Sequence, residues 1–276
     1  MAKDKETGTG IPVEFKLGSL RESLTGILRN SFHRTCEFQA QGNQAREKCR
    51  EEFRSREREE DNIMRILVDS QIADVISNML RPVSSTDDAV SYQIGISASF
   101  VRTHFIICDL ILNGDLIEAV TLIRKQLESL ARLYELDKRP LEKLYGRTPN
   151  IGILFRQGGG EIYGHLSEVA HFSRSRVSDL MRIIQEGKQT DPCILPGFSE
   201  HSFACLDMHH FIAIYFIVWI TEKLSDWYPD VDLQERRKLL KRTVAYPEEI
   251  GIIRFPPESE RQEILRKIRA DENIRA

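Results

Sequence analysis

The chain has 276 residues, of which 41% are hydrophobic and 29% are charged. These values are typical of an ordinary folded, soluble protein and exclude an intrinsically disordered chain. Lys and Arg number 39 against 42 Asp and Glu, a formal net charge of -3, which excludes a globally basic nucleic-acid surface but not a local basic patch.

The N-terminal third is expected to form helices of different character. Apolar residues at helical spacing predict an amphipathic helix over Phe15–Phe38. From Gln44 to Asp61, bases and acids interleave three and four apart. This pattern favours a solvated helix over a nucleic-acid arm, because the acids cancel the bases. A further helix over Ile63–Leu80 is expected to end before Pro82.

The middle of the chain predicts two neighbouring helices. The first covers Ala89–Leu112 and stops at Asn113-Gly114. Asp115, with Glu118 three residues later, predicts a capping box for the second helix, Leu116–Leu136. Because the connection is short, the two helices should lie antiparallel to each other.

The remainder is expected to alternate between loops and helices. Gly146–Gly160 is mostly loop, and its final glycine triplet predicts a hinge rather than a phosphate-binding loop, since no Gly-Lys-Ser/Thr follows it. Further helices are expected over Glu161–Glu186, Ser199–Trp227, Asp232–Val244 and Glu258–Ala270, with Tyr246-Pro247 and Pro256-Pro257 separating the last two.

Convincing strands are scarce in this pattern, so the predicted class is all-α, a helical bundle with extra N-terminal and C-terminal helices. We expect three parts: a helical region with a highly charged helix over residues 1–88, a central bundle over residues 89–228, and polar helices over residues 229–276.

Cysteine usage and hydropathy bear on the compartment. The five cysteines are widely spaced and include no Cys-x-x-Cys pair, which predicts free thiols in a reducing environment. The N-terminal residues contain no apolar run typical of a secretory signal. The most apolar run, Phe211–Ile220, has about half the ~20 residues of a membrane span. We therefore expect a cytoplasmic protein with no membrane partner.

The stretch Glu161–His171 carries the densest set of chemically useful side chains. Glu161 and His165 are four residues apart, and His165, Glu168 and His171 follow at intervals of three, so on a helix adjacent members are neighbours. This spacing suits metal binding, acid-base catalysis or a polar network in the core.

A second constellation places Arg124, Glu128 and Arg132 at four-residue intervals. Flanking leucines and isoleucines put this stripe beside the core, where Glu128 would orient His165 or His171. A histidine oriented by a carboxylate is a candidate general base. A satisfied structural network would have the same pattern, so both interpretations stay open. The candidate catalytic residues are Arg124, Glu128, His165 and His171.

A metal-dependent alternative rests on Glu-x-x-His spacing, which di-metal carboxylate proteins use on their bundle helices. Glu168 with His171 matches it, and Asp207 with His210 is a looser instance. With Glu128 added, the candidate ligands of a divalent metal are Glu128, Glu168, His171, Asp207 and His210. The leading interpretation needs no cofactor. His104 lies in an apolar helix, which favours a core histidine over a ligand.

Two segments, Ile123–Tyr134 and Tyr163–Phe172, resemble a group of bacterial helical proteins that carry an Arg-x-x-x-Glu helix followed by a Tyr-x-x-Leu-Ser-x-x-x-His helix. This group is similar to HEPN and abortive-infection proteins, and the resemblance covers about residues 90–225. It implies a helical bundle, often dimeric, that works in bacterial stress or phage defence. RNA cleavage is the activity it implies first.

The chain departs from the HEPN ribonuclease motif, in which four to six residues separate an arginine from a histidine. Arg29 and His33 have three intervening residues, Arg102 and His104 have one, and Arg156 and His165 have eight. We therefore expect a HEPN-like protein, homodimeric, that binds or acts on RNA or a nucleotide. The other hypotheses are the di-metal enzyme and a scaffold or effector-binding subunit that recruits a partner protein.

Overall fold

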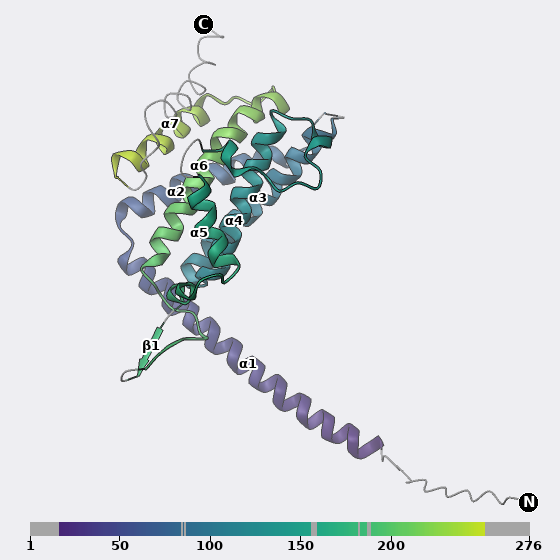
Figure 1. The fold of residues 1–276 in the computed structure, drawn as a ribbon, viewed down its shortest axis with the longest axis vertical. Helices are drawn as coiled ribbons and strands as arrows, with labels where there is room; N and C mark the ends of the chain where they lie inside the picture. The colour runs from purple at the N-terminus through teal and green to yellow at the C-terminus, as the bar shows by residue number, and fades with distance from the viewer. Residues whose placement is uncertain are drawn as a thin grey trace, which may run out of the picture. The chain divides into compact units, whose positions relative to one another are not determined.

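The computed structural model describes residues 17–251, apart from residues 84, 86, 156–158, 182 and 187–188 (Figure 1). Two compact units divide the chain, Met1–Gln44 and Ala45–Ala276. The predicted helix over residues 258–270 and the glycine at position 158 lie outside the described residues. The division into residues 1–88, 89–228 and 229–276 stays a prediction.

The first helix is longer than expected. The predicted amphipathic and charged helices form one element, α1 (Leu17–Arg56), whose described part in the first unit exposes several large apolar side chains, namely Leu24, Ile27, Leu28, Phe32 and Phe38. In the second unit α1 ends at Arg56, and α2 begins at Glu59.

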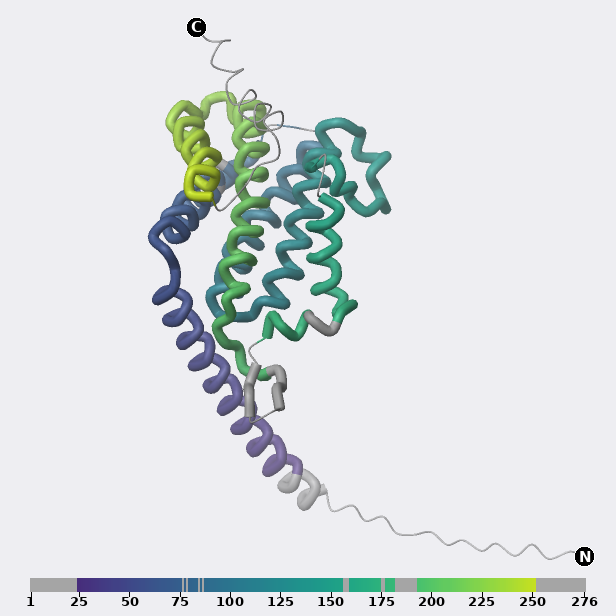
Figure 2. The backbone as a smooth tube through the Cα atoms, turned by 60° about the vertical axis from the view of Figure 1, so that its left-hand side comes forward, coloured from purple at the N-terminus to yellow at the C-terminus, as the bar shows by residue number. Residues whose placement is uncertain are grey.

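The second unit is a bundle of helices, and the all-α prediction is confirmed. Antiparallel neighbours α3 and α4 pack on each other, α4 also packs on α5, and α6 packs on α2, α3 and α4 (Figure 2). The helices α2 and α6 also contact α7. The bounds are α2 Glu59–Met79, α3 Asp88–Asn113, α4 Leu116–Leu136, α5 Gly159–Ala170, α6 His201–Trp227 and α7 Gln234–Glu249.

Helix α6 forms the centre of the core. Nearly every side chain from Ile212 to Thr221 is buried, and Phe216 stacks on Phe100 of α3 with ring centroids 4.0 Å apart. By length and composition α3 and α6 could each cross a membrane, but 72% of the apolar window of α6 is buried within the fold. The core helix of a soluble protein passes the same test, so the absence of a membrane partner stays a prediction.

The turn between α3 and α4 forms where the sequence placed it, but its cap differs. Gly114 adopts a φ of 78°, as expected of a helix-terminating glycine. An added Cβ there would lie 2.5 Å from the carbonyl oxygen of Gly197. The predicted capping box of Asp115 is wrong: its side chain makes no cap hydrogen bond. It instead accepts a hydrogen bond from Arg46 Nε at 2.9 Å, which joins α1 to α4.

Two helix predictions fail in the second half of the chain. The helix expected to run to Glu186 ends at Ala170. A 3-10 turn and an antiparallel hairpin follow, η3 (Ser175–Leu180), β1 (Ile183–Glu186) and β2 (Gln189–Pro192). Helix α7 continues through Pro247, which was expected to end it.

A single carboxylate joins three helices at the end of α4. Asp137 accepts a hydrogen bond from Trp219 Nε1 of α6 at 2.7 Å and another from Gln93 Nε2 of α3 at 3.0 Å. The Lys223 ammonium of α6 lies 2.8 Å from the same carboxylate. Because the donors come from α3 and α6, Asp137 fixes the position of the end of α4 relative to these two helices.

Candidate functional site

The packing of α4 against α5 brings three of the four predicted catalytic residues together. Arg124 and Glu128 are one turn apart on α4, and His171 follows the last residue of α5. Tyr163 of α5 is the fourth member; it begins the Tyr-x-x-Leu-Ser-x-x-x-His motif but was not among the predicted catalytic residues. We call these four residues the α4–α5 polar centre.

Arg124 is the hub of this centre. Its Nη1 lies 2.9 Å from His171 Nε2, and its Nη2 donates to the Tyr163 hydroxyl at 2.8 Å. Nη2 also lies 3.1 Å from Glu128 Oε1. A guanidinium has donors only, so His171 Nε2 must be the acceptor in the first contact, and the imidazole is neutral while that contact holds.

Glu128 has a different role from the predicted one. It accepts a hydrogen bond from the Tyr163 hydroxyl at 2.8 Å, and it contacts Arg124 rather than either histidine. The expectation that Glu128 orients His165 or His171 is therefore not met. Arg124 holds His171, and Tyr163 joins Arg124 to the carboxylate.

The surroundings keep Arg124 charged and partly accessible. Its hydrogen bond with Tyr163 raises the pKa of the guanidinium, and the negative charge of Glu128 adds to this. The guanidinium carbon lies 5.1 Å from the centroid of the Tyr163 ring, in cation–π range. The side chain remains 21% exposed. The centre therefore holds a charged guanidinium, balanced by the Glu128 carboxylate, at a position that a ligand from solvent can reach.

The end of α5 presents an exposed aromatic ring, Phe172, directly after His171 in the chain. Phe172 has a φ of 49° and closes the helix in a Schellman arrangement, its amide donating to the carbonyl of Val169 while the amide of Ser173 donates to that of Glu168. Glycine or asparagine usually occupies this left-handed position, because a Cβ there costs ~1–2 kcal/mol. Phe172 nevertheless occupies it with 66% of its surface exposed.

The other residues of the predicted catalytic set and stripe lie elsewhere. His165 is on the exposed side of α5 and has no part in the contacts described above. Glu168 pairs with Arg174 at 2.9 Å. Arg132, the third member of the α4 stripe, is buried, donates to the carbonyls of Leu144 and Arg147, and pairs with Glu135. Arg132 is therefore part of the core rather than the polar centre.

The five ligands of the di-metal alternative are not gathered in one place. Glu128 and His171 are engaged in the α4–α5 polar centre, and Glu168 is paired with Arg174. Asp207, on α6, lies near Asp61 and Arg58 and not near these residues, and burial raises its pKa to about 6. Among the described residues, the group that could hold a metal is a different one.

That group is His104, Cys108 and His209, which we call the buried His-Cys cluster. One candidate ligand atom from each residue lies within 4.8 Å of the others. His104 and Cys108 are one turn apart on α3, and the ring of His209 from α6 stacks on that of His104 with centroids 4.4 Å apart. All three side chains are buried.

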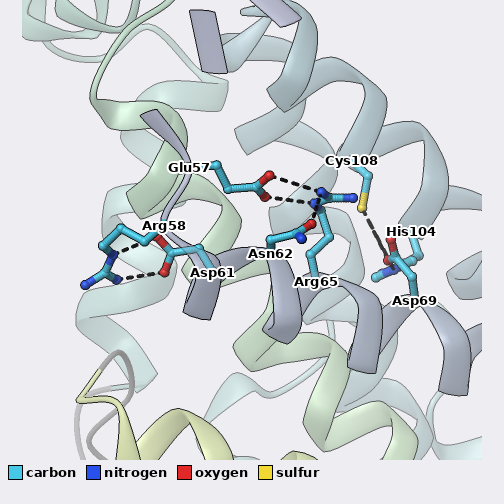
Figure 3. A network of polar contacts seen from close by, with 8 residues as sticks. All are labelled: Glu57, Arg58, Asp61, Asn62, Arg65, Asp69, His104 and Cys108. Carbon is cyan, nitrogen blue, oxygen red and sulfur yellow. Dashed lines mark hydrogen bonds and ion pairs between the residues drawn. The ribbon is translucent and has the colours of Figure 1, made fainter. Parts of the chain in front are cut away.

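Asp69 of α2 adjoins this cluster (Figure 3). Its Oδ1 lies 2.7 Å from His104 Nε2 and 3.9 Å from Cys108 Sγ. An ionised carboxylate only accepts, so His104 Nε2 carries the hydrogen in this contact. In the neutral tautomer with this hydrogen, the other ring nitrogen, Nδ1, offers a lone pair.

Several polar atoms of this region have no hydrogen-bond partner among the described residues: His104 Nδ1, both ring nitrogens of His209 and His210 Nε2. Each buried, unpaired group costs roughly 1–3 kcal/mol. Burial lowers the pKa of His209 well below its usual value, and the proximity of His104 lowers it further. Burial also lowers the pKa of His210 to about 3 and raises that of the Cys108 thiol.

Sequence reasoning missed this cluster. The four-residue spacing of His104 and Cys108 was a usable signal, because it places two ligand types on one helix face. The third member comes from a helix 100 residues away, and the adjacent His209 and His210 gave no indication of which one faces α3. Packing of α6 against α3 decides that it is His209.

Comparison with known proteins adds no further constraint: no family model matches the chain, and no curated protein or solved structure matches it.

Proposed function

We propose that this protein binds single-stranded RNA through the α4–α5 polar centre, as a HEPN-like component of a bacterial stress or phage-defence system. The observation that carries the proposal is the contact between Arg124 Nη1 and His171 Nε2 at 2.9 Å. The two residues are 47 positions apart, so the missing Arg-to-His spacing in sequence does not prevent an arginine–histidine pair from forming in space.

The chemistry of the pair suits a phosphodiester. A guanidinium forms two parallel hydrogen bonds with phosphate oxygens, and Arg124 can do so by exchanging its contacts with His171 and Tyr163. His171 would then have Nε2 free to bond a phosphate oxygen or a ribose hydroxyl. Glu128 would remain behind Tyr163 and limit how far the arginine can move.

Phe172 supports RNA over a free phosphate ligand. Phe172 is exposed and directly follows His171, which contacts Arg124. Single-stranded nucleic acids commonly stack a base on an exposed aromatic ring near a phosphate-binding group, and such stacking contributes ~1–3 kcal/mol. The strained left-handed backbone of Phe172 is explained if the ring is retained for a ligand.

The test is RNA binding measured by fluorescence anisotropy on the full-length protein, with a labelled single-stranded RNA of mixed sequence at several salt concentrations. We expect Arg124→Gln to weaken binding by about 10-fold to 100-fold, because a charge-assisted contact is worth ~1.5–3 kcal/mol. The matched control is Lys125→Gln, which removes the same charge from the adjacent exposed position.

The outcome that contradicts the proposal is equal affinity of the two variants, since binding would then depend on net charge alone. Absence of RNA binding at low salt would contradict it as well.

The same samples, analysed on a denaturing gel, test cleavage: RNA shortened by the wild type but not by His171→Ala would add catalysis to binding. Scattering measurements of mass in solution would test the expected homodimer.

A further inference from the structure

We propose that His104, Cys108 and His209 bind one transition-metal ion of the zinc and copper class. This inference is independent of the proposed RNA site, because the buried His-Cys cluster lies between α3 and α6 and shares no residue with the α4–α5 polar centre. It goes beyond the di-metal alternative, whose predicted ligands were different residues.

The side chains of the cluster are those that zinc and copper prefer. Two imidazoles and one thiolate suit zinc or copper, whereas magnesium and calcium prefer oxygen ligands. One candidate ligand atom from each residue lies within 4.8 Å of the others. Cys108 Sγ is 3.9 Å from His104 Nε2, the nitrogen that faces Asp69, so the His104 ring would have to turn to present Nδ1 to the same ion. Ligands at ~2.0–2.3 Å from one ion are ~3.3–3.6 Å apart in a tetrahedron, so the three side chains would also move closer and the stacking of His104 on His209 would open.

Ring nitrogens of the cluster also have lone pairs that could bind an ion. His209 is fully buried, and neither of its ring nitrogens makes a hydrogen bond of normal geometry among the described residues, which is unusual for a buried imidazole. The backbone of His104 is close enough to interact with the ring, so a metal would replace a weak contact rather than none. A neutral imidazole offers a lone pair to a metal from one nitrogen. His104 Nδ1 offers another, since Nε2 of that ring faces Asp69.

The charges around the cluster also favour a cation. Asp69 contacts the His104 ring and the Cys108 thiol. The guanidinium of Arg65 is hydrogen-bonded to Glu57 at 3.0 and 3.1 Å and to Asn62 at 2.7 Å (Figure 3), so Glu57 offsets part of the positive charge that Arg65 places near Cys108. In many metal sites a carboxylate holds the histidine ligand in this way. Asp69 is thus a positioning residue.

Binding would follow a simple balance. The Cys108 thiol releases its proton to solvent as sulfur bonds to the ion, and no electron is transferred. The bond to the cation is what makes a thiolate stable in this buried position. Three protein ligands leave a fourth position for water or a small ligand.

The experiment uses full-length protein, stripped with a chelator under denaturing conditions and refolded with Co²⁺, Zn²⁺ or Cu²⁺ alone. We expect one ion per chain by mass spectrometry of the desalted protein, and with Co²⁺ or Cu²⁺ a thiolate-to-metal charge-transfer band. Competition between Zn²⁺ and Cu²⁺ distinguishes the two metals.

Cys108→Ser should abolish the band, and the matched control Cys205→Ser, another buried cysteine in the core, should keep it. His209→Gln should weaken Co²⁺ binding by at least tenfold while far-UV circular dichroism stays helical, so that the proposal does not depend on one variant folding. A band that persists in Cys108→Ser, a wild type that takes up no ion, or equal binding by His209→Gln would each overturn the proposal.

Discussion

The α4–α5 polar centre and the buried His-Cys cluster use similar side chains in opposite ways. In the first, Arg124, Glu128, Tyr163 and His171 are mutually bonded and partly exposed. In the second, the imidazoles are buried and four ring nitrogens in and beside the cluster lack partners among the described residues. The first region pairs its polar groups with one another apart from Arg124 Nε, whereas the second leaves most of its ring nitrogens without partners.

This difference separates two kinds of binding site. At the surface, polar groups can bond to one another or to water, so such a network costs little free energy when no ligand is bound. Its arginine can also exchange one acceptor for another. A buried group without a partner raises the free energy of the fold until something supplies the missing bond. The exposed centre therefore tolerates the absence of a ligand, whereas the cluster gains stability from an ion.

The comparison is sharpest on α4 itself, where Arg132 is buried and Arg124 is not. Arg132→Met should lower the free energy of unfolding by about 3–5 kcal/mol, because it leaves Glu135 buried without its cation. Arg124→Met should cost about 1 kcal/mol or less, since exposed ion pairs contribute little. Chemical denaturation of both variants measures the difference, and equal losses would show that the two arginines do not differ in this way.

Replacing His209 by leucine should have effects of opposite sign with and without metal. In excess Zn²⁺ the variant loses the stabilisation that a bound ion supplies, about 3–4 kcal/mol at 100 to 1,000 times the Kd. In chelator it should be as stable as the wild type or more stable, because an apolar group replaces two unpaired nitrogens. Urea titrations in the two buffers give the sign, and a loss of equal size in both would argue for a purely structural histidine.

Phe172 allows stability and binding to be separated in the exposed centre. Phe172→Gly should raise the free energy of unfolding by about 1 kcal/mol by relieving the left-handed backbone. It should also weaken RNA binding by about 1–3 kcal/mol through loss of a stacking surface. Phe172→Tyr keeps the ring and the strained backbone, so neither change is expected in it. A glycine variant that binds RNA as the wild type does would remove Phe172 from the site.

The helices that were predicted correctly are those with a strong apolar period and a clear end. Leu116–Leu136 was predicted to the residue, and Gly114 forms the expected turn. The failed helix beyond Ala170 has no such end signal, because Phe172 adopts a left-handed conformation that sequence rules assign to glycine or asparagine. At Pro247 the sequence does contain a residue that usually ends a helix, yet α7 continues through it, because α7 packs on α2 and α6.

The two candidate sites also differ in how much of each could be predicted from the sequence. Arg124 and Glu128 could be identified because both lie on one turn of one helix, and His171 because it follows Glu168 at a spacing of three. Their partners could not be assigned, since the Tyr163 hydroxyl is placed between them only by the packing of α4 on α5. For the His-Cys cluster, even the membership depends on tertiary contacts.

Asp137 has a consequence for motion. Since one carboxylate receives Trp219, Gln93 and Lys223, the end of α4 cannot loosen without releasing α3 and α6 as well. We expect the amide protons near this junction on the three helices to exchange with solvent as one cooperative unit. The helix that carries Arg124 is thus anchored at its far end, so that a ligand at the polar centre meets a rigid support.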